Sequence, residues 1–339
     1  MTATIKDVAR EANVSVASVS RALNGHGSMA EETRARVLQV AKRLNYAPNG
    51  MARSLIMRRT HTLGALLPEL HGEFFSELIR GIDLAARSNG MHLMVSSSHG
   101  NAAEVATALQ AMRGRVDGLL LMSPYADAGF LQQNLSDALP TVLMNTRMPG
   151  TGISSFSVDN YAAARAMVTH LVACGHRRIV HVAGPTENFD AAERRRGYED
   201  ALRALLPDQR PEVVAGRFTE ESGHAAGARI AAMAEPPDAV FAANDSMAIG
   251  CLFALGAAGL RVPEDIAVTG FDDIPIARFI NPPLTTLRVR IAELGRHAME
   301  RLVATVADQG NPRIETRTLE PELVVRASCG GDRTRKQTN

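Results

Sequence analysis

The sequence has few cysteines, no signal-like N-terminus and no long apolar run. Its 339 residues include three cysteines, Cys174, Cys251 and Cys329. They form no CxxC motif and show no Cys/His spacing typical of a zinc site, so we expect no disulfide framework and no metal. The N-terminus lacks an apolar h-region, and no apolar run approaches the ~18 residues that span a bilayer. These absences predict a reduced, cytoplasmic protein with no cofactor and no membrane partner.

The sequence also lacks the short motifs of the common enzyme classes. It contains no GxxxxGK[ST] loop, no GxGxxG between a strand and a helix, and neither HExxH nor GxSxG. Asp245 and Asp272 follow predicted strands and could form a carboxylate pair, but their spacing in the sequence does not give their separation. A two-lobed enzyme, such as a sugar kinase or a glycosidase, is therefore an alternative that we do not favour.

The first residues have the pattern of a helix-turn-helix unit. Apolar residues at helical spacing predict a first helix from Ile5, preceded by a capping box of Thr4 and Asp7. Asn13-Val14-Ser15 interrupts this pattern, because Asn tolerates a left-handed turn and Ser is a good N-cap. A second helix is predicted over 16–24. In such a unit the second helix enters the DNA major groove by its N-terminal residues.

A third helix and the charge balance support this interpretation. Ser28 and Glu31 match a second capping box, which predicts that the third helix begins at Ser28. Residues 1–60 hold ten lysines and arginines against four acids, so their net charge is +6, whereas the whole chain is +1 and residues 61–339 are −5. A basic head on an acidic body indicates a polyanionic partner that contacts the head. A solute-binding protein would need an export signal and would have no use for this head.

From Leu63 onward, β-rich runs alternate with amphipathic helical segments such as 75–89 and 160–173. This alternation predicts parallel sheets that are covered on both faces. Nine strands exceed what one open sheet needs, so we expect two similar doubly wound lobes with a ligand cleft between them. The predicted strands are Leu63–Leu67, His92–Ser96, Val116–Met122, Thr141–Asn145, Ser155–Val158, Arg178–Ala183, Glu212–Ala215, Ala239–Ala242 and Ile266–Thr269.

The segment between head and body has the composition of a linker. Pro48 ends the third helix, and a helix over 50–57 would be too short to be stable alone in water. DNA and a second subunit could order it, and Leu55 beside Arg53 would then be an apolar wedge for the minor groove. The alternative for Leu55 is a small hydrophobic plug against the body.

Several runs of residues resemble one known family. They are TIKDVAREANVSVASVSRALNG and LNYAPNGMARSL, followed in the body by FFSELIRGI, SVDN, GHRRI, AERRRGY, AANDSMAIG, GFDD and PPLTT. Over residues 4–328 the sequence resembles the LacI/GalR family of bacterial transcriptional repressors. The resemblance implies an all-α helix-turn-helix headpiece, a periplasmic-binding-protein-like α/β body, and a homodimer that binds a near-palindromic operator. The tail after Leu323 has no leucine heptad, so we expect no tetramer.

The resemblance and the strand pattern together predict the division of the chain. The predicted parts are the DNA-binding headpiece 1–48, the hinge 49–60, a first effector lobe of 61–159 plus 291–319, a second lobe of 160–290 plus 320–329, and a disordered tail 330–339.

The resemblance also implies which residues contact DNA. Val16, Ala17 and Arg21 are the expected base readers, since Arg can hold guanine bidentately and small apolar side chains match a thymine methyl. The alternative for Val16 and Ala17 is filler on an exposed turn. Leu55 resembles the family's paired leucine levers, and Arg53 belongs to the same contact set. Phosphate contacts position the protein on DNA but do not read the base sequence, and the residues expected to make them are Thr4, Ser15, Ser20, Asn24 and Arg34.

The implied effector-binding residues are Phe74, Phe75, Asn145, Arg194, Phe218, Asn244 and Asp272. Asn, Arg and Asp offer in-plane donors and acceptors that match sugar hydroxyls, and Phe rings cover an apolar ring face. The alternatives are core packing for one of the two adjacent Phe residues, and helix capping for Asn145, Asn244 and Asp272. Asp159 and Asp273 are expected to be structural.

The effector class is the least determined part of the prediction. A phosphate requires more than one cation, and Arg194 is the only basic residue in this set, so we favour a neutral sugar over a sugar phosphate or a nucleobase. The predicted function is a repressor of a carbohydrate-utilisation operon that a small sugar releases from DNA. Whether the effector acts as a corepressor instead stays open, as do the operator sequence and the regulated genes.

Overall fold

The computed structural model describes residues 3–24, 29–46, 59–136, 138–308 and 313–330. The chain divides into two compact units, residues 1–60 (the head) and residues 61–339 (the body). The predicted hinge positions Arg53 and Leu55 and the tail from residue 331 lie outside the described residues.

The head consists of α1 (Ile5–Glu11), α2 (Val16–Asn24) and α3 (Glu31–Arg43) around a small apolar core. Asn13 has a φ of 51°, which confirms the predicted left-handed turn. The capping box of Thr4 and Asp7 is also confirmed. The predicted start of the third helix at Ser28 is wrong, because α3 begins at Glu31 with Ala30 as its N-cap and without a side-chain cap. Two acids in its first turn interact favourably with the helix dipole instead.

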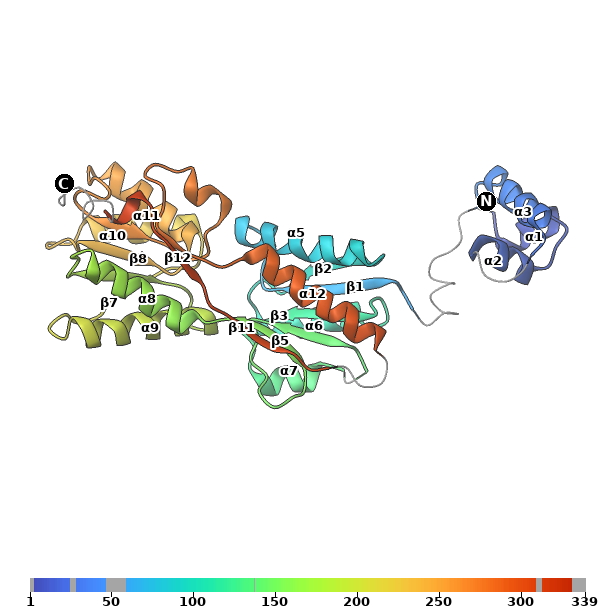
Figure 1. Ribbon diagram of the computed structural model, residues 1–339, viewed down its shortest axis with the longest axis horizontal. Coiled ribbons are helices and arrows are strands. Elements are labelled where there is room, and N and C mark those ends of the chain that lie inside the picture. The colour runs from blue at the N-terminus through green and yellow to red at the C-terminus, as the bar shows by residue number, and fades with distance from the viewer. Residues whose placement is uncertain (1–2, 25–28, 47–58, 137, 309–312, 331–339) are drawn as a thin grey trace. The chain divides into compact units, whose positions relative to one another are not determined.

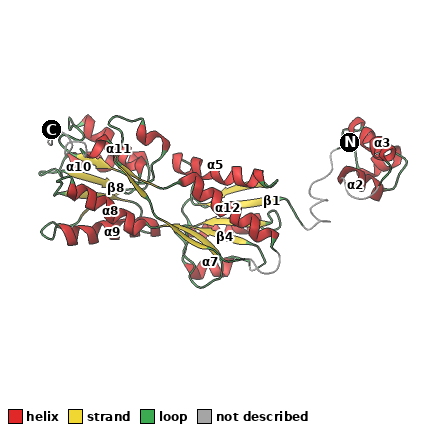
Figure 2. Cartoon of the chain, viewed as in Figure 1, coloured by secondary structure: helices red, strands yellow, loops and turns green. Residues whose placement is uncertain are grey.

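The first lobe of the body is built on a six-stranded parallel sheet of order β11-β5-β4-β3-β1-β2. Its strands are β1 (Thr62–Leu67), β2 (His92–Ser97), β3 (Gly118–Met122), β4 (Thr141–Met144), β5 (Ser154–Val158) and β11 (Thr316–Leu319). The helices α5 (Glu73–Ser88), α6 (Ala102–Met112), α7 (Ala128–Asn134) and α12 (Ile291–Ala307) flank it (Figures 1 and 2). Strand β3 is fully buried, as expected for a sheet covered on both faces.

The second lobe is built on a four-stranded parallel sheet of order β7-β6-β8-β9. Its strands are β6 (Ile179–Ala183), β7 (Glu212–Ala215), β8 (Ala239–Ala242) and β9 (Ala267–Thr269). Its helices are α8 (Asn160–Ala173), α9 (Phe189–Leu205), α10 (Glu220–Ala231), α11 (Asp245–Ala257) and the short η1 (Pro275–Arg278). The predicted fold class, an α-helical head and an α/β body with two parallel sheets, is confirmed.

The chain passes between the two lobes three times, after β5, before α12 and after β11 (Figure 1). Two short strands, β10 (Thr286–Arg288) and β12 (Glu322–Val324), pair antiparallel beside these passages, and η2 (Ala327–Cys329) follows. The sequence analysis missed β10, β11 and β12. β10 and β12 have three residues each, and β11 is an exposed edge strand of sequence TRTL. None of the three therefore gives an apolar run that marks a buried strand.

Helices α10 and α11 pack backbone to backbone through glycine. A Cβ atom on Gly223 would lie 2.2 Å from the Met247 carbonyl oxygen, and one on Gly250 would lie 2.0 Å from the Glu220 carbonyl oxygen. Both distances are far below van der Waals contact, so only glycine permits this spacing. The packing fixes Asn244, the N-cap of α11, just beyond the carboxyl end of strand β8 in the second sheet.

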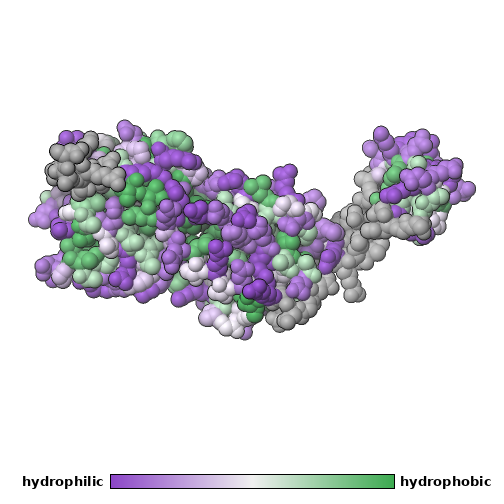
Figure 3. Space-filling view, in the orientation of Figure 1, coloured by the Kyte–Doolittle hydropathy of each residue, from purple (hydrophilic) through white to green (hydrophobic). Residues whose placement is uncertain are grey.

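The surface shown in Figure 3 is mostly hydrophilic, with smaller hydrophobic patches. Among the described residues of the body, Phe253 and Phe279 each keep 73% of their surface exposed, and Leu84 keeps 52%. No helix in the described part of the chain is long and apolar enough to cross a membrane.

Candidate functional site

A cavity of about 290 Å³ lies between the two lobes of the body. All seven predicted effector residues line it: Phe74, Phe75, Asn145, Arg194, Phe218, Asn244 and Asp272. They come from the two lobes, and several of them follow the carboxyl ends of strands, where ligands bind in open α/β sheets. The structure thus brings the whole set together, while their contact with an effector stays a prediction.

Arg194 is held in place by the second lobe. Its Nε donates to Asn160 Oδ1 over 2.8 Å, and its Nη1 donates to the Ala243 carbonyl oxygen over 2.5 Å. Its guanidinium lies 3.6 Å from the centre of the Phe271 ring. These contacts fix the side chain, as a preorganised ligand-binding group requires.

Two buried acceptors in the cavity have no hydrogen-bond partner among the described residues, Asn145 Oδ1 and Asp272 Oδ1. Arg194 Nη2 is 3.6 Å from Asp272 Oδ1, which is an ion-pair distance but too long for a hydrogen bond. Asn145 and Asp272 also have positive φ angles, 43° and 113°. Unpaired buried oxygens and uncommon backbone angles are expensive, and both are typical of binding sites.

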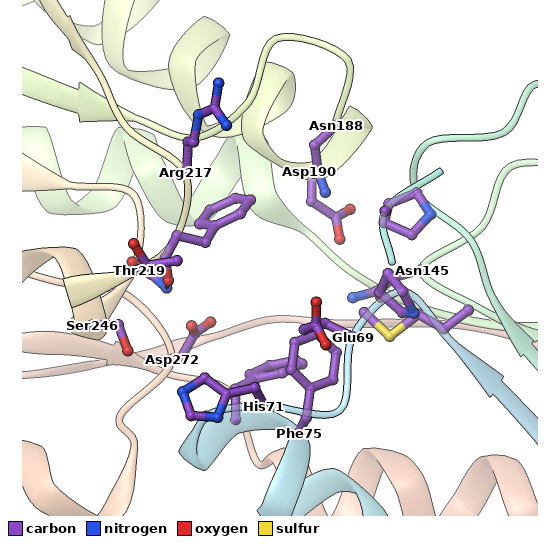
Figure 4. Close-up of a pocket in the computed structure, with 18 of the residues that line it drawn as sticks. Glu69, His71, Phe75, Asn145, Asn188, Asp190, Arg217, Thr219, Ser246 and Asp272 are labelled. Carbon is purple, nitrogen blue, oxygen red and sulfur yellow. Dashed lines mark hydrogen bonds between the residues drawn. The ribbon is translucent and has the colours of Figure 1, made fainter. Parts of the chain in front are cut away.

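The carboxyl groups of Asp190 and Asp272 point toward the middle of the cavity (Figure 4). Burial raises the pKa of Asp272 to about 7 and that of Asp190 to about 6, although the nearby Arg194 guanidinium lowers both. Asp190 Oδ1 also accepts a hydrogen bond of 2.9 Å from Asn160. A ligand hydroxyl would therefore meet carboxyl groups that change protonation near neutral pH.

The predicted capping alternative holds for one strand-end residue. Asn244 Oδ1 accepts from the Met247 N–H over 3.0 Å, so it caps α11, while its Nδ2 donates to the Phe218 carbonyl oxygen. Asn145 and Asp272 cap no described helix. Phe74 and Phe75 lie in the first turn of α5, half-buried and edge to face, 5.2 Å apart between ring centres.

Several lining residues were missed by the sequence analysis. Glu69 and His71 lie after β1, Tyr125 after β3, and Arg217 after β7. The rule that ligand contacts follow strand ends could have found them, since each lies within a few residues of a predicted strand. Arg194 is the only basic residue among the seven predicted positions, but His71, His99 and Arg217 also line the cavity.

The acidic residues near the cavity include structural ones. Asp245 accepts from the Ile274 N–H over 2.9 Å and from Thr286 Oγ1 over 2.5 Å, and burial raises its pKa. These bonds hold α11 to the β9–β10 region, so Asp245 has a structural role rather than one in a carboxylate pair with Asp272. Asp159 caps α8, and Asp273 accepts from two arginines, Arg288 and Arg326, as the structural interpretation expected.

Of the predicted base readers, Val16 and Ala17 lie in the first turn of α2, and Arg21 lies one turn after Ala17. Val16 is 42% exposed, and Ala17 and Arg21 are also exposed. Arg21 Nε makes one long contact of 3.4 Å with the Ala17 carbonyl oxygen, within its own helix. This face of α2 is therefore available to a partner.

The predicted phosphate contacts have mixed surroundings. The Thr4 hydroxyl donates to Asp7 Oδ2 over 2.7 Å, and Ser15 Oγ accepts from the Ser18 N–H, so both residues also act as caps. Arg34 is exposed on α3, and Ser20 is half-buried in α2. Asn24 ends α2, and its side chain is outside the described part. Their contact with DNA stays a prediction.

Residues 4–49 match the description "Bacterial regulatory proteins, lacI family", and residues 168–329 match a periplasmic binding protein-like domain. The chain is 35% identical over 331 residues to the HTH-type transcriptional repressor CytR of Escherichia coli strain K12, covering 96% of each protein. It is 34% identical over 333 residues to the ribose operon repressor of Haemophilus influenzae, covering 96% of this chain and 98% of that protein.

Solved structures agree with these relatives. The lac repressor dimer bound to operator and the anti-inducer ONPF has a TM-score of 0.85 at 28% identity, covering 97% of this chain and 99% of the other. The complex of the transcriptional regulator CelR with cellobiose has a TM-score of 0.71 at 32% identity, covering 96% and 99%. These proteins are named as regulators rather than enzymes, in agreement with the sequence analysis. The chain belongs to the lacI family of bacterial regulatory proteins.

Proposed function

We propose that the chain is a DNA-binding transcriptional repressor that binds a near-palindromic operator as a homodimer and is released by a small sugar in the cavity of the body. The observation that carries this proposal is a pair of buried oxygens, Asn145 Oδ1 and Asp272 Oδ1, in the cavity between the two lobes, which have no hydrogen-bond partner in the described part of the chain. Such oxygens are satisfied by the hydroxyl groups of a ligand. The regulated operon would serve carbohydrate utilisation, and the protein would act in the cytoplasm.

The head supports the DNA-binding part of the proposal. Its exposed face on α2 combines one cation, Arg21, with two small apolar side chains, Val16 and Ala17. Arg can read guanine through two hydrogen bonds, and the apolar side chains can contact thymine methyl groups. Thr4, Ser15, Ser20, Asn24 and Arg34 would hold phosphates, and Arg53 and Leu55 would act in the minor groove.

The charges of the cavity support a neutral ligand. Its acidic side chains are Glu69, Glu73, Asp190, Glu220 and Asp272, and its basic ones are His71, His99, Arg194 and Arg217. Two of the acids have pKa values raised by burial, so the addition of a further anion would be unfavourable. A sugar instead supplies hydroxyl donors for the carboxyl groups and an apolar face for the Phe rings. The related regulator CelR forms a complex with cellobiose, which is a neutral disaccharide.

The homodimer and the release mechanism are linked in the proposal. Three exposed apolar side chains are candidates for the contact between subunits: Leu84 on α5, Phe253 on α11 and Phe279 directly after η1. The sugar would favour a closed arrangement of the lobes, which shifts the subunit contact and separates the paired hinge segments with their Leu55 levers. Light scattering should give about twice 36.3 kDa.

A thermal-shift panel tests the effector class directly. Monosaccharides, disaccharides, sugar phosphates and nucleobases are each added to the full-length protein, and a ligand that binds the folded state raises the melting temperature. We expect stabilisation by a neutral sugar. Stabilisation by a purine or a phosphorylated compound alone would contradict the sugar assignment. In a separate DNA-binding assay, a full-length protein without any sequence-specific DNA binding would contradict the assignment as a repressor.

A further inference from the structure

Three potential metal ligands meet in the second lobe, and none of them lines the effector cavity. His170 and Cys174 lie one helical turn apart at the end of α8, where Cys174 is the C-cap. Cys329 lies in η2, which the fold brings back to the same lobe near the end of the described chain. Residues four apart face the same side of a helix, so both side chains of α8 reach Cys329.

The spacing of the three ligand atoms fits a tetrahedral metal site. His170 Nε2 is 3.4 Å from Cys329 Sγ and 3.6 Å from Cys174 Sγ, and all three atoms lie within 4.8 Å of one another. A tetrahedral Zn²⁺ with Zn–S of about 2.3 Å and Zn–N of about 2.0 Å separates its N and S ligands by about 3.5 Å. The observed N···S distances therefore match two edges of such a tetrahedron without movement of the backbone.

The surroundings of the cluster support a ligand set of this kind. Cys329 is buried and held by two contacts: Thr285 Oγ1 donates to its Sγ over 3.2 Å, and its carbonyl oxygen is 3.1 Å from His176 Nε2. A hydroxyl donor beside a sulfur is a typical outer-shell contact of a metal thiolate.

We propose that His170, Cys174 and Cys329 bind a thiophilic divalent metal ion of the Zn²⁺ type, with solvent as the fourth ligand. His170 and Cys174 are half-buried, so the ion and a water molecule can reach the site from outside. On binding, each thiol loses its proton to solvent, and the two thiolates and the imidazole donate their electron pairs to the metal. The sequence analysis expected no metal because it found no CxxC motif and no Cys/His spacing typical of a zinc site. Cys329 is 155 residues from Cys174, and the fold brings the two together.

Bound metal would connect the last described segment of the chain to α8. Cys329 follows β12, whose partner β10 lies beside the passages between the lobes. The ion would thus stabilise the second lobe against local opening of its C-terminal segment. The site would be separate from the sugar cavity, so its occupancy does not depend on the proposed effector.

Cobalt titration of the full-length, chelator-treated and reduced protein tests the proposal. Co²⁺ bound to thiolate shows charge-transfer absorption in the near ultraviolet, which binding to histidines and carboxylates alone does not produce. We expect one Co²⁺ per chain with this absorption, displacement by Zn²⁺, and a higher melting temperature with Zn²⁺. Absence of the thiolate absorption in the reduced wild type would overturn the proposal.

Variants locate the site. Cys174→Ser and His170→Ala change half-buried positions, and each should weaken Zn²⁺ binding about tenfold or more. Cys251→Ser is the matched control, because Cys251 lies in α11 outside the cluster and should bind metal as wild type does. Circular dichroism verifies that each variant is folded. Equal Zn²⁺ affinity of Cys174→Ser and wild type would contradict the assignment. A reduced protein that binds no metal and forms a Cys174–Cys329 disulfide on oxidation would contradict it as well.

Discussion

The Nη2 atom of Arg194 lies 3.6 Å from Oδ1 of Asp272, and both side chains are buried at the cavity between the lobes. Asn160 and Ala243 hold the other nitrogens of the guanidinium, so Arg194 does not move closer to satisfy the carboxyl group. Among the described residues, a buried carboxyl oxygen is thereby left without a hydrogen-bond partner. In the proposed function, a ligand hydroxyl supplies this partner.

Asp272→Ala should remove most of the sugar affinity. The variant loses a charge-assisted hydrogen bond to the ligand, for which we expect about 1.5–3 kcal/mol, or roughly 10- to 150-fold in the dissociation constant. Titration calorimetry with the sugar found in the thermal-shift panel measures this change. Asp265→Asn is the matched control, since Asp265 pairs with Arg261 at the surface and does not line the cavity. Equal losses in the two variants would refute the assigned role.

The raised pKa of Asp272 predicts a specific pH dependence of stability. In the folded state its pKa is about 7, above the ordinary value of 3.8, so the protonated form is favoured by folding. Its contribution to the free energy of unfolding is present below pH 4 and is lost as pH rises through 7. Asp272→Asn stays neutral, so its melting temperature relative to wild type should rise between about pH 5 and pH 8. A constant difference over this range would show that Asp272 has an ordinary pKa.

Two arginines of the head should affect DNA binding differently. Arg21→Ala should reduce the discrimination between operator and random DNA, by about 1–3 kcal/mol per half-site. Arg34→Ala should weaken both kinds of DNA and lower the slope of log affinity against log salt by about one, if Arg34 contacts phosphate. Anisotropy titrations at several salt concentrations separate the two effects. The same loss of specificity in both variants would contradict this division.

The close packing of α10 on α11 predicts opposite effects of two glycine substitutions in one helix. A Cβ on Gly250 would lie 2.0 Å from the Glu220 carbonyl oxygen, so Gly250→Ala should destabilise the protein by about 1–3 kcal/mol. A Cβ on Gly256 meets nothing within 4 Å, so Gly256→Ala should stabilise it by about 0.5–1 kcal/mol. Urea unfolding of the full chain measures both. Equal stability of the two variants would mean that the helices are not in this contact.

The elements that the sequence predicted well are those with strong local signals. The turn at Asn13, the capping box at Thr4 and the continuous apolar strands such as β3 follow from residue type and spacing alone. The short strands β10 and β12 depend on pairing between distant segments, and a three-residue strand has no period to detect. The start of α3 was misplaced because the capping-box pattern of Ser28 and Glu31 predicts that residues 29 and 30 are helical, whereas the helix begins at Glu31.

The candidate cavity was predicted in part. Its seven predicted residues follow from the resemblance, and the structure places them together. Arg217 and His71 lie in loops that follow strands, so the strand-end rule points to these loops, but which of their side chains line the cavity depends on the packing of the two lobes. The same holds for the cluster at Cys329, whose ligands come from segments far apart in the sequence.

The most direct test of the account is whether a ligand in the body controls DNA binding by the head. An operator selected from random DNA is titrated with the full-length protein by fluorescence anisotropy, with and without the stabilising sugar, for wild type and Asp272→Ala. We expect both proteins to bind the operator equally without sugar, and the sugar to weaken wild-type binding at least tenfold, about 1.4 kcal/mol, with no effect on the variant. Unchanged operator affinity of the wild type at saturating sugar, or the same release in Asp272→Ala, would contradict the account.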